Sequence, residues 1–262
     1  MSHAVKGRRP SRLAKAVIVA GSAAALTVGL SSSAFAAAPA ALPYQASAFQ
    51  DKYQPLFDYD SDGCFPSSAV GPDGQLNGGL NPSGNPGGDC RYVGSANTYV
   101  RTACDPNWCA YVYALYFEKD QGRFSGHRHD WEAVVVWQAR GAEEPSYVSA
   151  SAHGQYDTKP FNRIKRSGNR AKIVYHRDEP GTHAFRFAKS GEAPEVVKDW
   201  DRPNLVAMDR LRNTNGKAFD ALWNATWGSA NFPLQDRDAR FETTLNRAKP
   251  SQIRSFTPHR GL

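Results

Sequence analysis

Residues 126–132 read Gly-His-Arg-His-Asp-Trp-Glu and run without a break into Ala-Val-Val-Val-Trp at 133–137, and the rest of the chain is organised around this stretch. A β-branched apolar run of this kind predicts a buried strand that begins near Trp131. Residues 110–117, Ala-Tyr-Val-Tyr-Ala-Leu-Tyr-Phe, show a second strand pattern. The two segments predict a hairpin-like pair with a polar cluster at its mouth, and polar groups on a rigid sheet edge are a common binding site.

Four side chains that can bind a metal ion or handle a proton fall within six residues: His127, His129, Asp130 and Glu132. In a regular strand the two histidines share one face and the two carboxylates share the other, so all four cannot converge on one ion. Either the segment is looped or bulged, or only some of these side chains point inward. Oxygen ligands with one imidazole favour Mg²⁺, Ca²⁺ or Mn²⁺ over structural zinc. The plainer alternative is a polar loop whose charges pair with one another.

The first 36 residues have the pattern of a secretory signal peptide. Residues 1–15 carry five basic residues and no acidic one, residues 16–30 are mostly apolar, and Ala34-Phe35-Ala36 is a cleavage pattern. The apolar run is too short and too rich in Ala, Gly and Ser for a membrane anchor. We therefore predict that residues 1–36 are removed and that residues 37–262 form a single secreted, extracellular domain.

The formal net charge of the chain is +7, and five of the excess positive charges lie in the predicted signal peptide. The remaining chain is close to neutral, so its charge gives no reason to expect a nucleic-acid partner. Residues 37–262 are enough for one well-packed domain, which we expect to be soluble and monomeric.

All four cysteines lie in the loop-rich region 45–109. An even number of cysteines in an exported chain predicts disulfides, and three pairings are possible. We prefer Cys64–Cys90, which would tie down the Gly/Pro/Asn-rich loop 71–89, together with Cys104–Cys109, which would close a tight loop. A zinc site is the alternative, although secretion argues against free thiolates.

Residues 58–63 spell Asp-Tyr-Asp-Ser-Asp-Gly, the first half of an EF-hand calcium loop. Asp58, Asp60 and Asp62 are therefore candidates for a second calcium site. The twelfth position is Ala69 instead of the bidentate Glu, and helix-forming flanks are missing. A plain Asp/Gly turn is the alternative.

The rest of the chain alternates strand and helix patterns. Residues 146–152, 171–177 and 183–189 read as strands, and the last two flank a turn at 178–181, which predicts a hairpin. Short strands at this spacing predict a mainly β fold, an antiparallel β-sandwich. Three apolar stripes predict helices packed on the core: Leu205, Met208 and Leu211; Phe219, Leu222 and Trp223; Phe241, Leu245 and Ala248. We interpret the isolated His153, His176 and His183 as structural.

The heptapeptide at 126–132 resembles the hallmark sequence of the NLP family, the necrosis- and ethylene-inducing peptide-like cytolysins. Tyr-Phe-Glu-Lys-Asp at 116–120, Val-Val-Val-Trp at 134–137 and the Asp-Gly-Cys…Gly-Asp-Cys region ending at Cys90 are similar as well. The resemblance runs from roughly residue 45 to the C-terminus. It implies a β-sandwich flanked by helices and points to the same two disulfides.

The resemblance also implies a divalent cation, Ca²⁺ or Mg²⁺, in a surface cavity. Its ligands would be Asp120, His127, Asp130 and Glu132, with Lys119-Asp120 as the sequence anchor for the first of them. His129 and Trp131 would support the ligands from behind, and Arg128 would not bind the metal.

The function implied by the resemblance is that of a secreted, non-enzymatic toxin that disrupts plant plasma membranes. Members of the family recognise the sugar head of glycosylated inositol-phosphoceramide sphingolipids at the membrane surface. One alternative is a metal-dependent polysaccharide lyase or hydrolase in which His129 or Glu132 is a general base. Another is a secreted glycan-binding module without toxicity.

Overall fold

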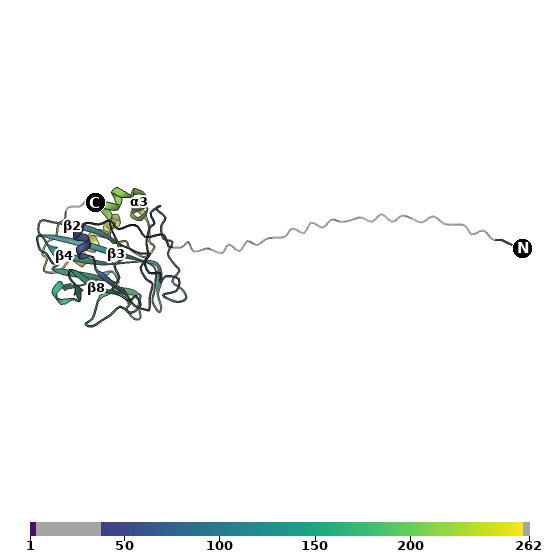
Figure 1. Cartoon of the computed structure of the whole chain (residues 1–262), viewed down its shortest axis with the longest axis horizontal. Helices are drawn as coiled ribbons and strands as arrows, with labels where there is room; N and C mark the ends of the chain where they lie inside the picture. The colour runs from purple at the N-terminus through teal and green to yellow at the C-terminus, as the bar shows by residue number, and fades with distance from the viewer. Residues whose placement is uncertain (4–37, 259–262) are drawn as a thin grey trace. The chain divides into compact units, whose positions relative to one another are not determined.

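The computed structural model describes residues 1–3 and 38–258, and residues 38–258 pack as one unit (Figure 1). The predicted cleavage after Ala36 lies outside the described residues, so the signal peptide and the domain boundary at residue 37 remain predictions. Within the described residues, no helix combines the length and the apolar character that a membrane span requires.

Within residues 38–258, ten strands build two sheets. The strands are β1 Leu56–Tyr59, β2 Asn97–Cys104, β3 Trp108–Gln121, β4 Gly126–Ala139, β5 Tyr147–Ala152, β6 Gln155–Pro160, β7 Arg166–Ser167, β8 Arg170–Arg177, β9 His183–Phe187 and β10 Asn204–Ala207. The larger sheet has the order β10-β2-β3-β4-β5-β6, and the smaller sheet has the order β1-β8-β7 with β9 also paired to β8. All pairs are antiparallel except β1–β8 and β10–β2.

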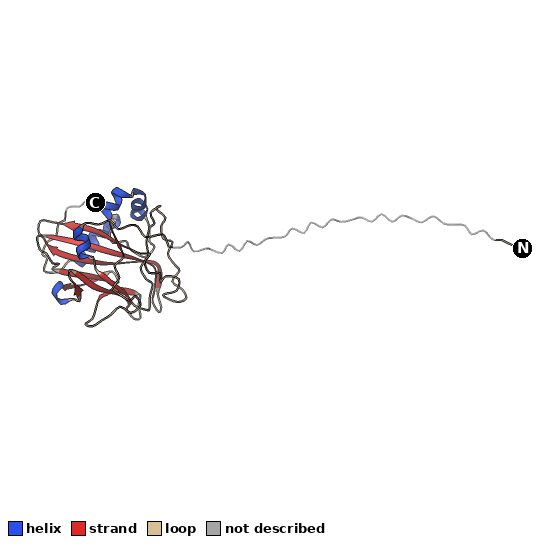
Figure 2. Cartoon of the chain, viewed as in Figure 1, coloured by secondary structure: helices blue, strands red, loops and turns tan. Residues whose placement is uncertain are grey.

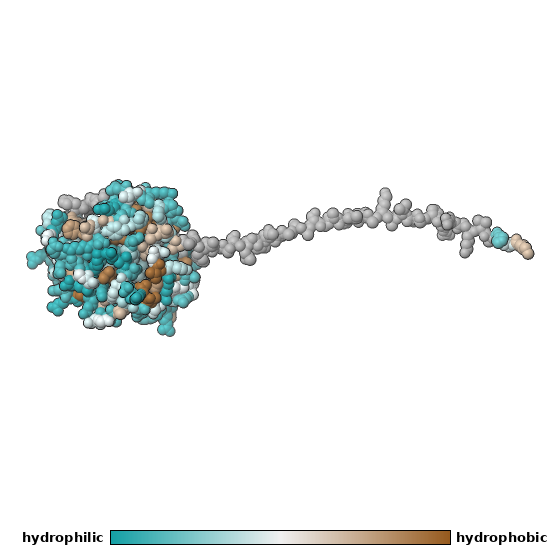
Figure 3. Space-filling view, viewed as in Figure 1, coloured by the Kyte–Doolittle hydropathy of each residue, from teal (hydrophilic) through white to brown (hydrophobic). Residues whose placement is uncertain are grey.

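The helices lie around the sheets (Figure 2). They are α1 Ala48–Tyr53, α2 Met208–Thr214, α3 Gly216–Asn224 and α4 Arg240–Ala248, with short 3₁₀ turns at Phe161–Arg163 and Arg237–Ala239. The predicted mainly β fold, a sandwich flanked by helices, is confirmed. The face in Figure 3 is mostly hydrophilic with separate apolar patches, because most large apolar side chains are inside.

Strand β3 is apolar at consecutive positions because both of its faces are buried. Val112 and Tyr116 belong to the core layer that also holds side chains of the helices, whereas Tyr113 and Phe117 belong to the layer shared with the smaller sheet. Phe117 stacks on Tyr175 of β8 with 3.8 Å between ring centroids. A strand buried on both faces needs apolar residues at every position, so the continuous run follows from the layering.

The two predicted disulfides, Cys64–Cys90 and Cys104–Cys109, are both present. Cys104 and Cys109 are paired residues in the register of β2 and β3, so the second bridge closes the turn of a hairpin. The first bridge ties down the loop that precedes β2, whose few apolar side chains cannot order it alone.

Two sequence-based boundaries were wrong. Strand β4 begins at Gly126 instead of near Trp131, so the heptapeptide is itself part of the strand. Leu205 was placed on a helical stripe but lies on β10, which pairs with β2, and the helix begins only at Met208. Strands β1, β2, β6 and β7 were not predicted.

Candidate metal centre

The hairpin of β3 and β4 places the predicted ligands opposite one another. Asp120 pairs with His127 across the two strands, and Asp130 lies three residues further along β4. His129, between them, has a positive φ of 61°, a left-handed conformation that histidine adopts more often than most residues. This interruption of the strand alternation allows His127 and Asp130 to reach one cluster, although a regular strand would separate them.

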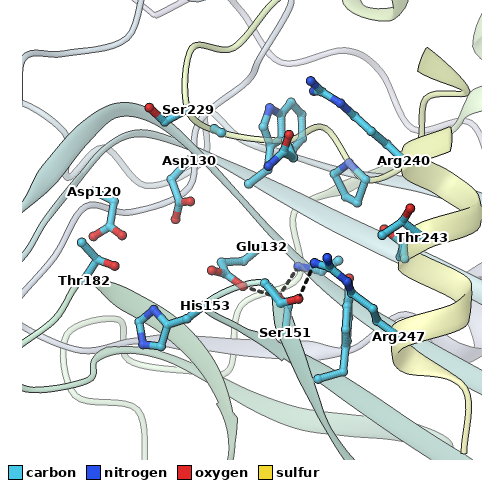
Figure 4. Close-up of a pocket in the computed structure, with 18 of the residues that line it drawn as sticks. Asp120, Asp130, Glu132, Ser151, His153, Thr182, Ser229, Arg240, Thr243 and Arg247 are labelled. Carbon is cyan, nitrogen blue, oxygen red and sulfur yellow. Dashed lines mark hydrogen bonds between the residues drawn. The ribbon is translucent and has the colours of Figure 1, made fainter. Parts of the chain in front are cut away.

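One potential ligand atom from each of Asp120, His127 and Asp130 lies within 4.8 Å of the other two. We call these three residues the hairpin cluster. It is the one group of three such side chains that the described residues bring together in this way. Glu132 lies outside the cluster but lines the same pocket (Figure 4). Its carboxylate accepts a hydrogen bond from the Ser151 hydroxyl.

His183 fixes the orientation of Asp120. Its backbone N–H donates to Asp120 Oδ1 at 2.9 Å, and its ring Nδ1 lies 2.7 Å from the same oxygen. The other ring nitrogen, Nε2, lies 3.3 Å from Asp62 Oδ1. Burial lowers the pKa of His183, but the carboxylates of Asp120 and Asp62 outweigh it and raise that pKa to about 9.

His127 is prepared to act as a ligand through Nε2. Its Nδ1 lies 2.7 Å from the carbonyl oxygen of His129, which can only accept, so Nδ1 carries the proton. Nε2 is then the lone-pair nitrogen, and it lies 3.8 Å from Asp120 Oδ2. A backbone hydrogen bond that fixes the tautomer in this way is a usual companion of metal-binding histidines.

The carboxylates of the pocket are costly to keep charged without a cation. Burial and the neighbouring Asp120 raise the pKa of Asp130 to about 7, although the Tyr175 hydroxyl lies 3.2 Å from its Oδ2. Burial and the neighbouring Asp130 also raise the pKa of Glu132 well above its usual range. A divalent cation would offset this repulsion, so the donor set of two to three carboxylates and one imidazole fits a hard cation.

His129 and Trp131 lie behind the hairpin cluster. His129 Nδ1 is 2.7 Å from the Tyr116 hydroxyl, and its ring makes an edge contact with Trp227. Burial lowers the pKa of His129 to about 4, so the ring is neutral. Trp131 is buried in the aromatic core beside Tyr116. These contacts agree with a supporting role, which remains an interpretation.

Arg128 points to a loop and not to the hairpin cluster. Its guanidinium donates to the carbonyl oxygens of Gly78 and Gly79 and contacts the Asn81 side chain. Gly79 has φ +62°, and a Cβ atom there would lie 2.6 Å from His129 Nδ1, so only glycine fits this approach. Arg128 thereby holds the loop against the heptapeptide.

The hairpin cluster opens into a cavity of about 620 Å³. Asp120 and Asp130 lie on one side of it, and Arg240, Thr243 and Arg247 of α4 lie on the other (Figure 4). A cavity of this size falls within the usual range for small-molecule sites.

The candidate second calcium site is not assembled in the same way. Asp58 accepts from its own neighbour Tyr59, Asp60 lies 3.5 Å from Arg186, and Asp62 accepts from the backbone of Arg177. The described residues show no set of three ligand atoms there within 4.8 Å of one another. The second site therefore stays a prediction.

Sequence reasoning missed His183 and the basic wall of the cavity. His183 was set aside as an isolated structural histidine, and no local pattern connects it with Asp120, 63 residues earlier. The basic wall had a detectable signal, because Arg240, Thr243 and Arg247 share one helical face by their spacing.

Comparison with known proteins identifies similar chains. Residues 47–248 match the family described as "Necrosis inducing protein (NPP1)". NLP effector protein 10 of Phytophthora capsici is 35% identical over 195 residues, which cover 72% of this chain and 77% of that protein.

Two solved structures have a similar fold. The structure of NLPPya in complex with mannosamine has a TM-score of 0.69 and 31% identity, covering 82% of this chain and 97% of that one. The non-toxic HaNLP3 protein has a TM-score of 0.67 and 28% identity, covering 81% of this chain and 97% of that one.

Proposed function

The chain belongs to the NPP1 family of necrosis-inducing proteins, and from this premise we propose that it is a secreted, cation-dependent cytolysin. Its target would be the glycosylated inositol-phosphoceramide sphingolipids of plant plasma membranes. The observation that carries the proposal is the hairpin cluster at the mouth of a cavity large enough for a sugar.

The residues of the site would hold the cation as follows. Asp120, oriented by His183, and Asp130 supply oxygen ligands, and His127 supplies Nε2 because its Nδ1 is engaged. Glu132 lies two residues beyond Asp130 on β4 and would complete the set. A bound Ca²⁺ or Mg²⁺ would offer open coordination positions to sugar hydroxyls.

Sugar binding at this site is supported by a similar protein. NLPPya, which shares the fold at 31% identity, has been solved in complex with mannosamine. The affinity of one site for one sugar is expected to be weak, so retention on a membrane would depend on many head groups at high local concentration.

The rim of the site has a side chain suited to a membrane surface. Phe124 stands at the tip of the β3–β4 hairpin and is 80% exposed. The tip is held in place, because Gly122 donates to the Ser125 carbonyl oxygen and a Cβ at Gly122 would lie 2.1 Å from Gly181 O. Exposed apolar side chains such as Phe can bury themselves at a membrane surface, so Phe124 would contact the bilayer when the cavity holds a head group.

Dye release from vesicles tests the proposal. Vesicles of phosphatidylcholine with and without the plant sphingolipid would receive mature protein in excess Mg²⁺ or in EDTA. We expect release only where both sphingolipid and Mg²⁺ are present. Asp130→Ala should abolish release, whereas Asp220→Ala on the exposed side of α3 should not.

Other results of this assay, of a sugar-binding assay and of a polysaccharide digest would contradict the proposal or favour an alternative function. Equal release from both kinds of vesicle, or equal release in EDTA, would overturn the proposal. Sugar binding without dye release would favour the non-toxic glycan-binding module. HaNLP3, which has a similar fold, is described as non-toxic. New reducing ends or unsaturated sugars in a polysaccharide digest would favour the lyase or hydrolase.

A further inference from the structure

The cavity beside the hairpin cluster continues to a wall of opposite charge. Helix α4 presents Arg240, Thr243, Thr244 and Arg247 to the cavity, at spacings of three, four and seven residues. Such spacings place side chains on one face of a helix. The buried face of the same helix, with Phe241, Leu245 and Ala248, packs on the core. The polar face of α4 is therefore directed at the cavity by the packing of its apolar face.

The two arginines of this wall keep most of their hydrogen-bonding capacity. Arg247 Nη1 donates to Gly154 O at 2.7 Å, which uses one of its five N–H groups. None of the ion pairs among the described residues involves Arg247. Arg240 Nη2 is 3.6 Å from Asp238 Oδ2, but that carboxylate is 72% exposed and its pull is screened by water.

The cavity thus has an acidic end and a basic end. Asp120, Asp130 and Glu132 lie toward one end and the arginines toward the other (Figure 4). A cation in the hairpin cluster would occupy only a small part of about 620 Å³. The remaining volume is bordered by hydroxyl groups and guanidinium groups, which are donors suited to an anion and to sugar oxygens.

We propose that Arg240 and Arg247 form an anion subsite, so that the cavity selects a sugar bearing a carboxylate or phosphate group over a neutral sugar. This inference rests on the proposed sugar binding at the hairpin cluster. Guanidinium groups match the geometry of carboxylate and phosphate with two parallel hydrogen bonds, and partial burial strengthens that pairing. The sugar hydroxyls would face the acidic end and the anionic group would face α4.

The test compares sugars that differ only in the anion. Mature protein saturated with Mg²⁺ would be titrated by NMR with D-glucose, D-glucuronate, the uncharged methyl ester of glucuronic acid, and glucose 6-phosphate. Wild type should bind glucuronate or glucose 6-phosphate about tenfold more tightly than glucose or the ester. The charged sugar that shows the preference identifies the anion, and the comparison with the ester needs no variant.

Variants assign the preference to α4. In Arg240→Gln/Arg247→Gln the charged sugars should no longer bind more tightly than glucose. Arg166→Gln is the matched control, because Arg166 lies on β7, outside the cavity, with Glu144 as its partner, and it should keep the preference. If the double variant does not fold, Arg247→Gln alone should lose most of the preference.

The outcomes separate this inference from the proposed function. If Mg²⁺ and glucose bind but glucuronate and glucose 6-phosphate bind no more tightly than glucose, the anion subsite is refuted and the proposed function stands. If Mg²⁺ does not bind, the proposed function fails. Preference for a charged sugar that survives in the double variant would also refute the assignment to Arg240 and Arg247.

Discussion

The sequence offers two acidic segments as cation sites, and the structure arranges their side chains differently. The segment 58–62 has an aspartate at every second position, whereas the hairpin cluster draws its three residues from two strands. Only the hairpin cluster brings three ligand atoms within 4.8 Å in the described structure. Convergence of side chains across a strand pair, and not their density along the chain, distinguishes the two.

Backbone conformation explains the difference. Asp58 ends up buried on β1, while Asp60 and Asp62 follow it into a turn and find separate partners. In the hairpin, antiparallel register places Asp120 opposite His127, and the left-handed His129 lets Asp130 reach the same point. The two segments are also connected through His183, whose two ring nitrogens face Asp120 and Asp62.

The largest expected effect is the loss of cation-linked stabilisation in Asp130→Ala and Glu132→Ala. At a cation concentration of 100 times Kd, wild type should gain about 2.7 kcal/mol and melt roughly 5–10 °C higher than in EDTA. Both variants should lose this difference, since each lacks a carboxylate of the site. In EDTA they should melt at or slightly above wild type, because the repulsion among carboxylates is relieved.

Asp60→Asn is the matched change in the other segment, and it should keep the full cation-linked difference. If Asp60→Asn removes it while Asp130→Ala keeps it, the roles of the two segments are reversed. Wild type that melts at one temperature in EDTA and in excess cation, with both variants lower in either condition, would make the heptapeptide a structural cluster of charges.

A second, smaller effect is expected at the residue that joins the two segments. His183→Asn should weaken cation binding about 10- to 100-fold, because Asp120 loses the ring that orients it. Asp62→Asn, which keeps that contact, should weaken it much less. Isothermal titration with Mg²⁺ and Ca²⁺ measures both, and His176→Asn on β8 is the control. Unchanged affinity in a folded His183→Asn variant would show that Asp120 needs no positioning by His183.

The hairpin was predictable because its two strands are buried on both faces and so are apolar without interruption. The disulfide pairing was predictable because Cys64–Cys90 ties down a loop with little apolar content and Cys104–Cys109 closes a tight loop. The site at the heptapeptide was also predictable, because most of the candidate ligands are close in the sequence. What sequence could not supply is the packing of one sheet on the other, which alone brings His183 of β9 to Asp120 of β3.

The misplacement of Leu205 has a similar origin. Leu205, Met208 and Leu211 are all fully buried, and their spacing of three matches a helical stripe. Leu205 is buried because β10 pairs with β2, a parallel contact between segments about a hundred residues apart in the sequence. A strand followed directly by a helix can reproduce helical spacing by chance, and tertiary pairing decides between the two.

A third prediction, of about 1 kcal/mol, concerns the left-handed residue on which the hairpin cluster depends. His129→Gly and His129→Ala both remove the ring contacts with Tyr116 and Trp227. The free energy of unfolding should be about 1 kcal/mol lower for the alanine variant than for the glycine variant. The Cβ atom of alanine disfavours positive φ, and glycine has no such penalty. Urea unfolding of both variants gives this difference. An alanine variant as stable as the glycine variant would mean that His129 is not left-handed in solution.

The smallest effect is expected at Arg128, inside the same heptapeptide as the ligands. Arg128→Ala should leave cation affinity unchanged or slightly higher, because a guanidinium has no lone pair to donate and its positive charge opposes the cation. The increase should be small, since Arg128 is partly exposed and its charge is screened by salt.

His127→Ala should weaken cation binding clearly, because Nε2 is a ligand candidate with a fixed tautomer. Titration of both variants with Mg²⁺ decides the matter. The loop that Arg128 holds through Gly78, Gly79 and Asn81 should loosen in Arg128→Ala, and faster amide exchange in that loop would reveal this. Equal loss of cation affinity in the two variants would mean that the loop contact organises the carboxylates, and that the hairpin alone does not assemble the site.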